Sequence, residues 1–284
     1  MSILIVGGNS RLTSRIISKY NIKYITTRRE CKNQNQIYLD LRDISGFKIP
    51  TDVKNCLIIG GPVSYSQSNE GEKFVKDIHE KQIPNLVSRL LKKDIYTVYV
   101  SSNMVLGKLC KDRSEKAFPM PNINYGKMKY LCEKMILDKS NQLNKKNKIA
   151  ILRLTKNISH DTSPFRDWII NYRLSKKIYA FNDLYISPIN YESSANVLMK
   201  LIELQEPGIF HFSGECDKNY FEICCEINKI LESQNRKQLR VVSVKSFEKG
   251  INLEDTGNIT RLDMKRSTAK LDILPMTIND ISKY

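Results

Sequence analysis

A hydroxyl, a phenol and an amine lie close together near the middle of the chain, and these three groups suit the reduction of a carbonyl. Ser101 and Ser102 end an apolar run, and Tyr125 and Lys129 follow in the segment YGKMK. Their spacing of four residues places Tyr125 and Lys129 on one face of a helix. An ammonium group beside a phenol supports proton transfer near neutral pH. With Ser102 holding a substrate oxygen, the three residues are candidate catalytic groups.

The Tyr-x-x-x-Lys spacing alone does not select Tyr125. Residues 94–102 are rich in β-branched and aromatic side chains and predict a buried strand, whose carboxyl end is where open α/β sheets bind ligands. Only Tyr125 begins the helical segment after that strand. Two other pairs share the spacing, Tyr130/Lys134 and Tyr172/Lys176. Tyr130 would face away from the site on the same helix, and the apolar spacing around Tyr172 predicts an ordinary packed helix. For Tyr125 too, a helix pair without a catalytic role is the alternative.

The amino-terminal segment predicts a dinucleotide-binding unit. Residues 2–20 form a short apolar run, a glycine turn and a helical pattern, which suits a phosphate at the helix N-terminus. Further apolar runs alternate with helical stretches, and one of them ends in Gly60, Gly61 and Pro62. This alternation predicts an α/β fold with a Rossmann-like, doubly wound parallel sheet. The first apolar run is too short for a secretory signal or a membrane span.

Several segments together resemble the extended short-chain dehydrogenase/reductase superfamily. Within it, the chain is similar to the dTDP-4-dehydrorhamnose reductase-like, sugar-nucleotide-modifying enzymes, which are related to the NAD-dependent epimerases and dehydratases. VYVSSNMVLG (98–107) looks like the strand with the family's catalytic Ser or Thr, and NYGKMKYLCEK (124–134) like its Tyr-Gly-x-x-Lys helix. The other matching segments follow in the family's order: 150–161, 178–203, 208–231 and 260–281.

The resemblance implies an enzyme, an NAD(P)-dependent oxidoreductase that reduces a nucleotide-linked 4-keto-6-deoxy sugar with NADPH. Its catalytic residues would be Ser102, Tyr125 and Lys129. Two alternatives stay open: a C4 epimerase or dehydratase on the same scaffold, and a non-catalytic NAD(P)-binding sensor or subunit. The implied cofactor-binding residues are Gly7, Ser10, Arg11, Leu12, Arg28, Arg29, Asp40, Leu41, Gly60, Gly61, Pro62, Tyr125 and Lys129.

The chain departs from the family's pattern in two places. Of the three glycines in the family's phosphate-binding turn only Gly7 is kept, and Ser10 and Thr13 replace the others. Since the third glycine normally lets the helix pack on the strand, we expect Thr13 to push the helix away or to turn outward. Asn103 and Met104 stand where this group usually has Asp-Tyr, which affects the fit of the substrate.

The end of the second predicted strand favours NADP over NAD. An NAD site usually places an acidic residue there for the ribose 2′-hydroxyl, whereas a 2′-phosphate calls for arginine. The chain has Thr26, Thr27, Arg28 and Arg29 at this point. A pair of merely solvated surface arginines is the alternative. Asp40 matches the family position that contacts the adenine.

The composition suits one intracellular unit, and we expect a cytoplasmic protein. The 284 residues include 7 cysteines without a Cys-x-x-Cys pattern, which indicates reduced thiols. The 3 histidines have no ligand spacing, so we expect no metal. The net charge of +16 comes from lysines spread over the whole chain. We therefore expect no nucleic-acid or membrane partner, and attraction of an anionic nucleotide-sugar instead.

We expect two lobes with the substrate in the cleft between them. Residues 1–155 would form the Rossmann domain, and 184–204 would return to it. Residues 156–183 and 205–284 would form most of a smaller C-terminal substrate-binding lobe. The oligomeric state stays open, a homodimer included.

Overall fold

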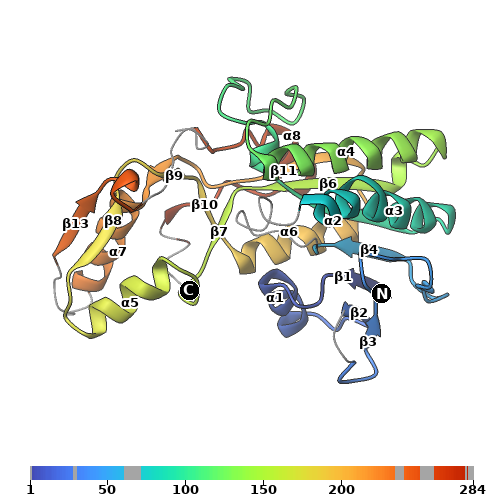
Figure 1. The fold of residues 1–284 in the computed structure, drawn as a ribbon, viewed down its shortest axis with the longest axis horizontal. Helices are drawn as coiled ribbons and strands as arrows, with labels where there is room; N and C mark the ends of the chain where they lie inside the picture. The colour runs from blue at the N-terminus through green and yellow to red at the C-terminus, as the bar shows by residue number, and fades with distance from the viewer. Residues whose placement is uncertain are drawn as a thin grey trace.

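The computed structural model describes residues 2–27, 31–60, 72–233, 240–249, 259–278 and 280. A large lobe built on a central sheet lies beside a smaller lobe (Figure 1). Among the described helices, none is long and apolar enough to cross a membrane.

Seven parallel strands form the central sheet, in the order β11-β6-β5-β4-β1-β2-β3. The order runs in opposite directions on either side of the β1–β4 pair, and such switch points are where α/β sheets bind ligands beyond the strand ends. The predicted doubly wound parallel sheet is confirmed, with Gly7 and Gly8 in the turn after its first strand. The strands are β1 Ile3–Val6, β2 Tyr24–Thr27, β3 Gln36–Tyr38, β4 Asn55–Ile58, β5 Tyr96–Ser102, β6 Ile149–Leu154 and β11 Gly208–Phe212.

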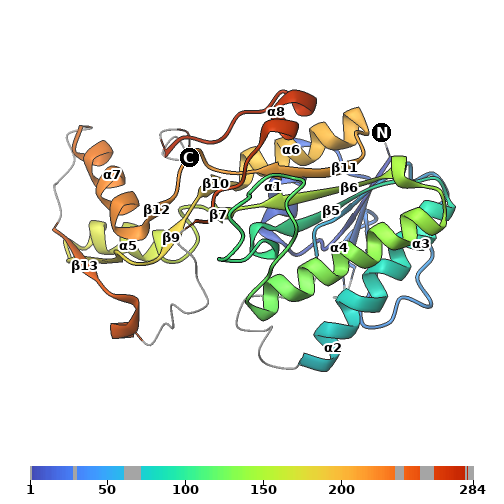
Figure 2. The same ribbon diagram turned by 90° about the horizontal axis from the view of Figure 1, so that it is seen from above.

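Helices cover both faces of this sheet (Figure 2). On one face α1 packs against α6, and on the other α3 packs against α4. Shorter helical turns lie at Ile78–Gln82, Asn103–Val105, Lys146–Lys148 and Ser246–Lys249. The helices are α1 Arg11–Lys19, α2 Glu72–Asp77, α3 Ile83–Lys92, α4 Asn124–Gln142, α5 Phe165–Arg173, α6 Tyr191–Leu204, α7 Tyr220–Ser233 and α8 Lys265–Leu271.

Each central strand is apolar on both sides because both sides are covered. In β1, Ile3 and Ile5 face the core shared with α1 and α6, whereas Leu4 and Val6 face the core shared with α3 and α4. All four side chains are at most 2% exposed. Strands buried on both faces require continuous apolar runs rather than alternation, which explains the sequence of β1.

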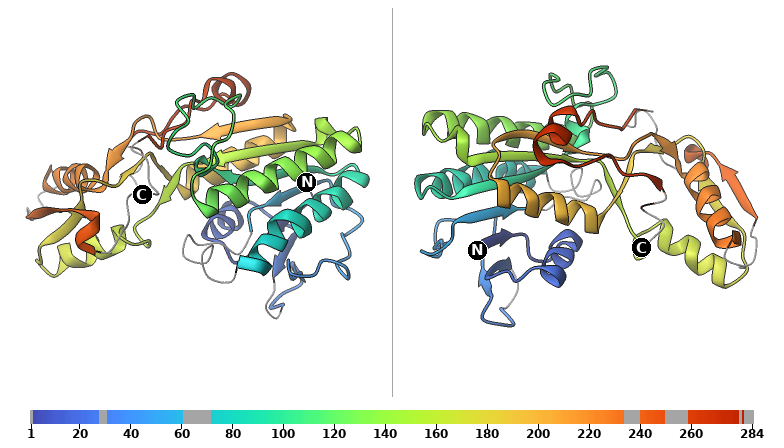
Figure 3. Two further views of the ribbon diagram at one scale, coloured as in Figure 1. Left: turned by 45° about the horizontal axis from the view of Figure 1, so that its top comes forward. Right: turned by 180° about the vertical axis from the view of Figure 1, so that it is seen from behind.

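The smaller lobe consists of paired short strands and two helices, seen at one side in Figure 3. Here α5 and α7 pack around an apolar cluster that contains Phe165 and Trp168. The two rings meet edge to face with centroids 4.9 Å apart. The strand pairs of this lobe are β8 Ile178–Phe181 with β13 Val241–Val244, and β9 Tyr185–Ile186 with β12 Lys218–Asn219. A third pair, β7 Lys156–Ile158 with β10 Pro188–Asn190, connects the lobes, because Ile189 packs in the large core and Ile158 in the small one.

The expected division of the chain differs from the structure in two segments. Strand β9 lies within residues 184–204, which we expect in the Rossmann domain, but it pairs with β12 of the smaller lobe. Residues 205–284 are expected mostly in the smaller lobe, but β11 pairs with β6 over five residues and forms the edge of the central sheet. Helix α8 also packs against β11. The apolar sequence GIFHF of β11 covers the edge of β6, whose backbone groups would otherwise lack partners.

Two buried histidines predict sensitivity to acid. Burial lowers the pKa of His79 to about 3, with a contribution from the charge of Lys129. Burial, with the nearby charge of Arg153, also lowers the pKa of His211 to about 3. In the unfolded chain a histidine titrates near about 6.5. Between these values the unfolded state binds more protons, so the free energy of unfolding falls as the pH drops, by about 1.4 kcal/mol per pH unit for each histidine.

Urea unfolding followed from about pH 7.5 to about pH 5.5 checks this expectation. His79→Gln removes one titrating group, so its free energy of unfolding should depend less steeply on pH than that of the unmodified protein. The exposed His160 offers a control, because His160→Gln should leave the slope unchanged. The same slope in His79→Gln as in the unmodified protein would show that His79 does not cause the acid sensitivity.

Candidate active site

Two glycines bring the ends of β1 and β4 together. Gly7 has a φ of +105°, and a Cβ atom there would lie 2.4 Å from the backbone nitrogen of Gly60. A Cβ atom on Gly60 would in turn lie 2.6 Å from the Cα atom of Gly7. Neither position accepts a side chain without movement of the backbone. The two predicted cofactor residues therefore bring the turn after β1 and the segment after β4 into backbone contact at the switch point of the sheet. The predicted Gly61 and Pro62 lie outside the described residues.

Helix α1 begins directly after this turn and is capped by its own side chains. The Ser10 hydroxyl accepts a hydrogen bond of 3.0 Å from the Thr13 backbone nitrogen. Thr13 is fully buried, and its hydroxyl donates to the Gly7 carbonyl over 2.8 Å. Of the two outcomes expected for Thr13, the outward turn is wrong, because the side chain is buried and its hydroxyl has a partner inside the turn. The hydroxyls of Ser10 and Thr13, which stand where the family has glycines, tie the helix to the turn.

Thr26 supports the same turn, a role that the sequence analysis did not assign. Its hydroxyl accepts from the Gly7 nitrogen over 3.2 Å, and its carbonyl accepts from the Gly8 nitrogen over 3.0 Å. The turn thus leads into the N-terminus of α1, whose first N–H groups have no carbonyl partner within the helix. Such an N-terminus suits an anion such as a pyrophosphate.

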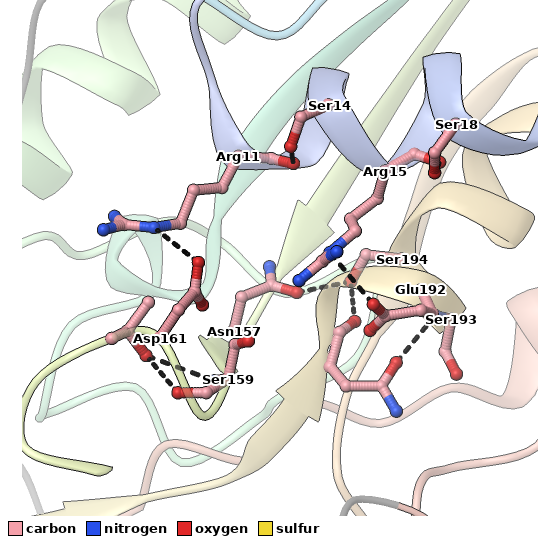
Figure 4. Close-up of polar contacts among 12 residues, drawn as sticks. Arg11, Ser14, Arg15, Ser18, Asn157, Ser159, Asp161, Glu192, Ser193 and Ser194 are labelled. Atoms are coloured by element: carbon pink, nitrogen blue, oxygen red, sulfur yellow. Dashed lines mark hydrogen bonds and ion pairs between the residues drawn. The ribbon is translucent and has the colours of Figure 1, made fainter. Parts of the chain in front are cut away.

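The two other predicted residues of this turn occupy different environments. Leu12 is 5% exposed and packs in the core, so only its backbone can face a ligand. Arg11 is exposed, and its guanidinium lies 3.6 Å from the Asp161 carboxylate of the loop after β7 (Figure 4). A hydrogen bond from Ser159 and the charge of Arg11 lower the pKa of Asp161 below its ordinary value. Arg11 thus meets an acidic group at the predicted phosphate site.

Further polar contacts in Figure 4 connect α1, β7 and α6. Arg15 pairs with Glu192 at 2.9 Å, and the Ser194 hydroxyl donates to the Asn157 side chain over 2.7 Å. These contacts hold the first turn of α6 and the end of β7 beside the predicted phosphate site.

The predicted adenine site follows β3. Asp40 pairs with Arg42, whose Nε donates to Asp40 Oδ2 over 2.8 Å. Leu41 is half-buried and packs against the core below α3. The Arg42 pair orients the Asp40 carboxylate at the carboxyl edge of the sheet. The predicted Arg28 and Arg29, which follow β2, lie outside the described residues.

The predicted catalytic Ser102 ends β5 at the same edge of the sheet. Its side chain is buried, at 8% exposure, and its oxygen accepts from the Met104 backbone nitrogen over 3.2 Å. Its hydroxyl donates to the Asn103 side-chain oxygen over 3.2 Å. Ser102 is therefore held by the short helical turn that follows the strand.

Lys129 is fixed to the same strand from helix α4. Its Nζ donates to the Val100 carbonyl over 3.1 Å and lies 4.9 Å from the centre of the Tyr99 ring. The side chain is 7% exposed. An ammonium group has three donors, so the bond to Val100 leaves two for other partners. The amine of Lys129 thus contacts β5 at Val100, two residues before Ser102.

Gly126 brings the first turn of α4 onto the loop after β5. A Cβ atom on Gly126 would lie 2.3 Å from the carbonyl oxygen of Met104. Only glycine allows this approach, and it places the adjoining Tyr125 beside the segment that carries Ser102. Burial raises the pKa of Tyr99, and the nearby phenol of Tyr125 adds a small contribution.

The structure brings the three predicted catalytic residues to one strand end without joining them directly. In the described part of the chain, no hydrogen bond links the side chains of Ser102, Tyr125 and Lys129 to one another. The tyrosines of the competing pairs lie in packing positions. Tyr130 packs beside the cluster of Val105 and Leu106, and Tyr172 packs in the core of the smaller lobe.

A buried ion pair behind the site escaped the sequence analysis. Arg153 of β6 donates to Glu133 of α4, with an Nη2–Oε2 distance of 2.7 Å, and both side chains are at most 2% exposed. Removing one partner of such a pair leaves a buried charge without compensation. Glu133 lies one helical turn beyond Lys129, so the pair fixes the rotation of α4. No local signal indicated this pair, because Arg153 and Glu133 lie on different elements that meet only in the folded chain.

A scan against protein families matches residues 1–253 to the RmlD substrate binding domain. The chain belongs to the RmlD substrate-binding-domain family. This membership agrees with the resemblance to dTDP-4-dehydrorhamnose reductase-like enzymes that the sequence segments carry. A search of curated proteins finds no significant match.

Several solved structures share the fold of this chain over nearly its whole length. A dTDP-4-dehydrorhamnose reductase from Bacillus anthracis, in complex with NADP, is 19% identical with a TM-score of 0.79, over 100% of this chain and 98% of that chain. A reductase of the same name from Yersinia enterocolitica is 18% identical with a TM-score of 0.79 over the same shares. A double mutant of DesIV, a dTDP-glucose 4,6-dehydratase from Streptomyces venezuelae, is 14% identical with a TM-score of 0.71, over 98% and 92%.

The turn between β1 and α1 fits the dinucleotide cofactor that the resemblance of this chain to the reductases implies. The backbones of Gly7 and Gly60 lie too close together for a side chain at either position, and the N-terminus of α1 follows directly. No cluster of three or more metal-ligating side chains occurs among the described residues. That the protein works without a metal stays a prediction.

Proposed function

We propose that this protein is an NADPH-dependent reductase of a nucleotide-linked 4-keto-6-deoxy sugar. One observation carries the proposal: helix α4 is held against the end of β5 at two points, through Lys129 on the Val100 carbonyl and through Gly126 on Met104. This contact collects a hydroxyl, a phenol and an amine at the carboxyl edge of the sheet. The family membership and the similar reductase structures support the same activity.

Each residue of the site has a separate role in the proposed reaction. The turn at Gly7, which the backbone of Gly60 supports, and the N-terminus of α1 would hold the cofactor's pyrophosphate. When bound, the nicotinamide supplies the hydride that reaches the keto carbon. Tyr125 donates its proton to the keto oxygen, which becomes a hydroxyl, and Ser102 hydrogen-bonds the same oxygen. Lys129 stabilises the ionised Tyr125 and uses a further donor for the ribose.

We propose further that NADPH binds more tightly than NADH, because Arg28 and Arg29 follow β2 and no acidic residue stands at Thr26 or Thr27. Calorimetric titration of both cofactors measures the preference. Replacing both arginines with alanine should bring the two affinities together, because the 2′-phosphate loses its charge-assisted partners. Equal affinities in the unmodified protein would refute the preference.

A turnover assay tests the proposed activity. NADPH oxidation is followed with a panel of nucleotide-linked keto sugars, and the product is identified by mass spectrometry. A reductase consumes one NADPH for each sugar reduced. Interconversion of sugars without net NADPH consumption would support the epimerase alternative. Binding of NADPH without any turnover across the panel would support the sensor alternative.

A further inference from the structure

Asp161 carries a negative charge into the predicted phosphate site. It lies in the loop after β7, and its carboxylate is 3.6 Å from the guanidinium of Arg11, the first residue of α1 (Figure 4). The first turn of α1 itself contains no acidic residue. The carboxylate beside this helix N-terminus therefore comes from a distant part of the chain.

The loop after β7 holds Asp161 in a tight turn. The Thr162 nitrogen donates to the Ser159 carbonyl over 3.0 Å, and the Ser159 nitrogen donates to the Thr162 hydroxyl over 3.1 Å. A hydrogen bond from Ser159 and the charges of Arg11 and Arg15 lower the pKa of Asp161. Asp161 is therefore ionised at neutral pH, and its place does not depend on Arg11 alone.

The ion pair between Arg11 and Asp161 is open to solvent and to a ligand. The two side chains are 56% and 47% exposed. The phenol of Tyr191, at the start of α6, also interacts with the Arg11 side chain. Because ion pairs with this exposure are weak, a phosphate group can compete with Asp161 for the guanidinium.

The charges around the N-terminus of α1 act on a bound pyrophosphate in opposite directions. The first N–H groups of the helix and the Arg11 guanidinium attract the negative phosphates. The Asp161 carboxylate repels them and also occupies Arg11. Both effects of Asp161 have the same sign, since each lowers the affinity for the cofactor.

We propose that Asp161 lowers the affinity of this site for the cofactor's pyrophosphate and thereby speeds the release of the cofactor. This inference rests on the proposed reductase activity. A reductase must exchange NADP⁺ for NADPH in every cycle, whereas an epimerase retains its cofactor through turnover. A carboxylate that weakens the hold on the pyrophosphate suits a site that exchanges its cofactor.

Calorimetric titration of Asp161→Asn with NADPH tests the proposal. Asparagine keeps the size of the side chain and removes its charge, so NADPH should bind about two- to fivefold more tightly, the range for one exposed charge contact. The gain should shrink at about 1 M salt, where the Debye length falls to about 3 Å. Unchanged or weaker binding, or a gain that salt does not reduce, would overturn the proposal.

Asp167→Asn is the matched control for this titration. Asp167 pairs with Arg166 at 3.3 Å in α5, and its side chain is 46% exposed, almost as much as that of Asp161. The same loss of charge at this site should leave the affinity for NADPH unchanged. An equal gain in both variants would assign the effect to the net charge of the protein and contradict a role for Asp161.

Stopped-flow displacement of bound NADP⁺ measures the release itself. Affinity differences between variants of one site arise mostly in the dissociation rate, so release from Asp161→Asn should be slower by about the same factor as the gain in affinity. Equal release rates in Asp161→Asn and the unmodified protein would contradict the proposal.

The inference and the proposed function fail in different ways. Absence of NADPH binding to the unmodified protein refutes both. Reduction of a keto sugar together with unchanged NADPH affinity in Asp161→Asn refutes the inference alone. Tighter NADPH binding by Asp161→Asn without turnover in either protein refutes the reductase activity and leaves the effect of Asp161 on cofactor affinity standing.

Discussion

Tyr125→Phe should abolish most turnover and leave NADPH binding intact. The change removes only the hydroxyl, so the expected loss in kcat is about 10²- to 10⁴-fold, as for other general acids. Steady-state kinetics on a keto sugar and a separate NADPH titration measure the two quantities. Tyr130→Phe is the matched control, because Tyr130 lies on the same helix and packs against the cluster of Val105 and Leu106. Unchanged turnover in Tyr125→Phe would place the acid elsewhere.

The neighbouring groups should respond differently to substitution. Lys129→Met should weaken NADPH binding as well as turnover, since the amine serves both the ribose and the phenol. Ser102→Ala should lower turnover with a smaller effect on NADPH affinity. Lys134→Met removes an exposed lysine one turn further along α4 and should change neither quantity.

Gly126→Ala should strongly lower the activity by adding a single methyl group beside the catalytic residues. The added Cβ atom would lie 2.3 Å from the Met104 carbonyl oxygen. Because this oxygen belongs to the backbone, the clash cannot be relieved by rotation of a side chain. Either the first turn of α4 or the loop after Ser102 must shift, which separates Tyr125 from the strand end. A misplacement of this kind can cost on the order of 10²-fold in kcat/KM.

Kinetics and thermal unfolding of Gly126→Ala should be compared with those of Gly46→Ala. A Cβ atom on Gly46 has no neighbour within 4 Å, so that variant controls for the loss of backbone freedom. We expect near-normal activity for Gly46→Ala and a large loss for Gly126→Ala. Similar kinetics in the two variants would show that the contact with Met104 does not position Tyr125.

The parts of the site that depend on local sequence were predictable. The apolar run before Ser102, the glycine turn after β1 and the start of α4 at the Tyr125 segment all follow from neighbouring residues. These signals define the sheet and its carboxyl edge, where the structure places the three candidate groups. The position of Tyr125 at the start of the helix after that strand, and not the shared Tyr-x-x-x-Lys spacing, separated it from Tyr130 and Tyr172.

The parts that depend on distant residues were not predictable. Thr13 faces inward because the Gly7 carbonyl is available to its hydroxyl, a contact that composition does not reveal. The Arg153–Glu133 pair and the Asn103–Thr260 bond join segments that are adjacent only in the folded chain. The place of β11 follows from the open edge of β6, not from its own sequence.

Transfer of deuterium from labelled NADPH is the most direct test of the account. NADPH carrying deuterium at the transferable position of nicotinamide C4 is incubated with the protein and a nucleotide-linked 4-keto-6-deoxy sugar, and the product is examined by mass spectrometry and NMR. The account predicts one deuterium at C4 of the reduced sugar for each NADPH consumed. Conversion of the sugar without deuterium at C4, or with no loss of NADPH, would contradict the assignment as a reductase.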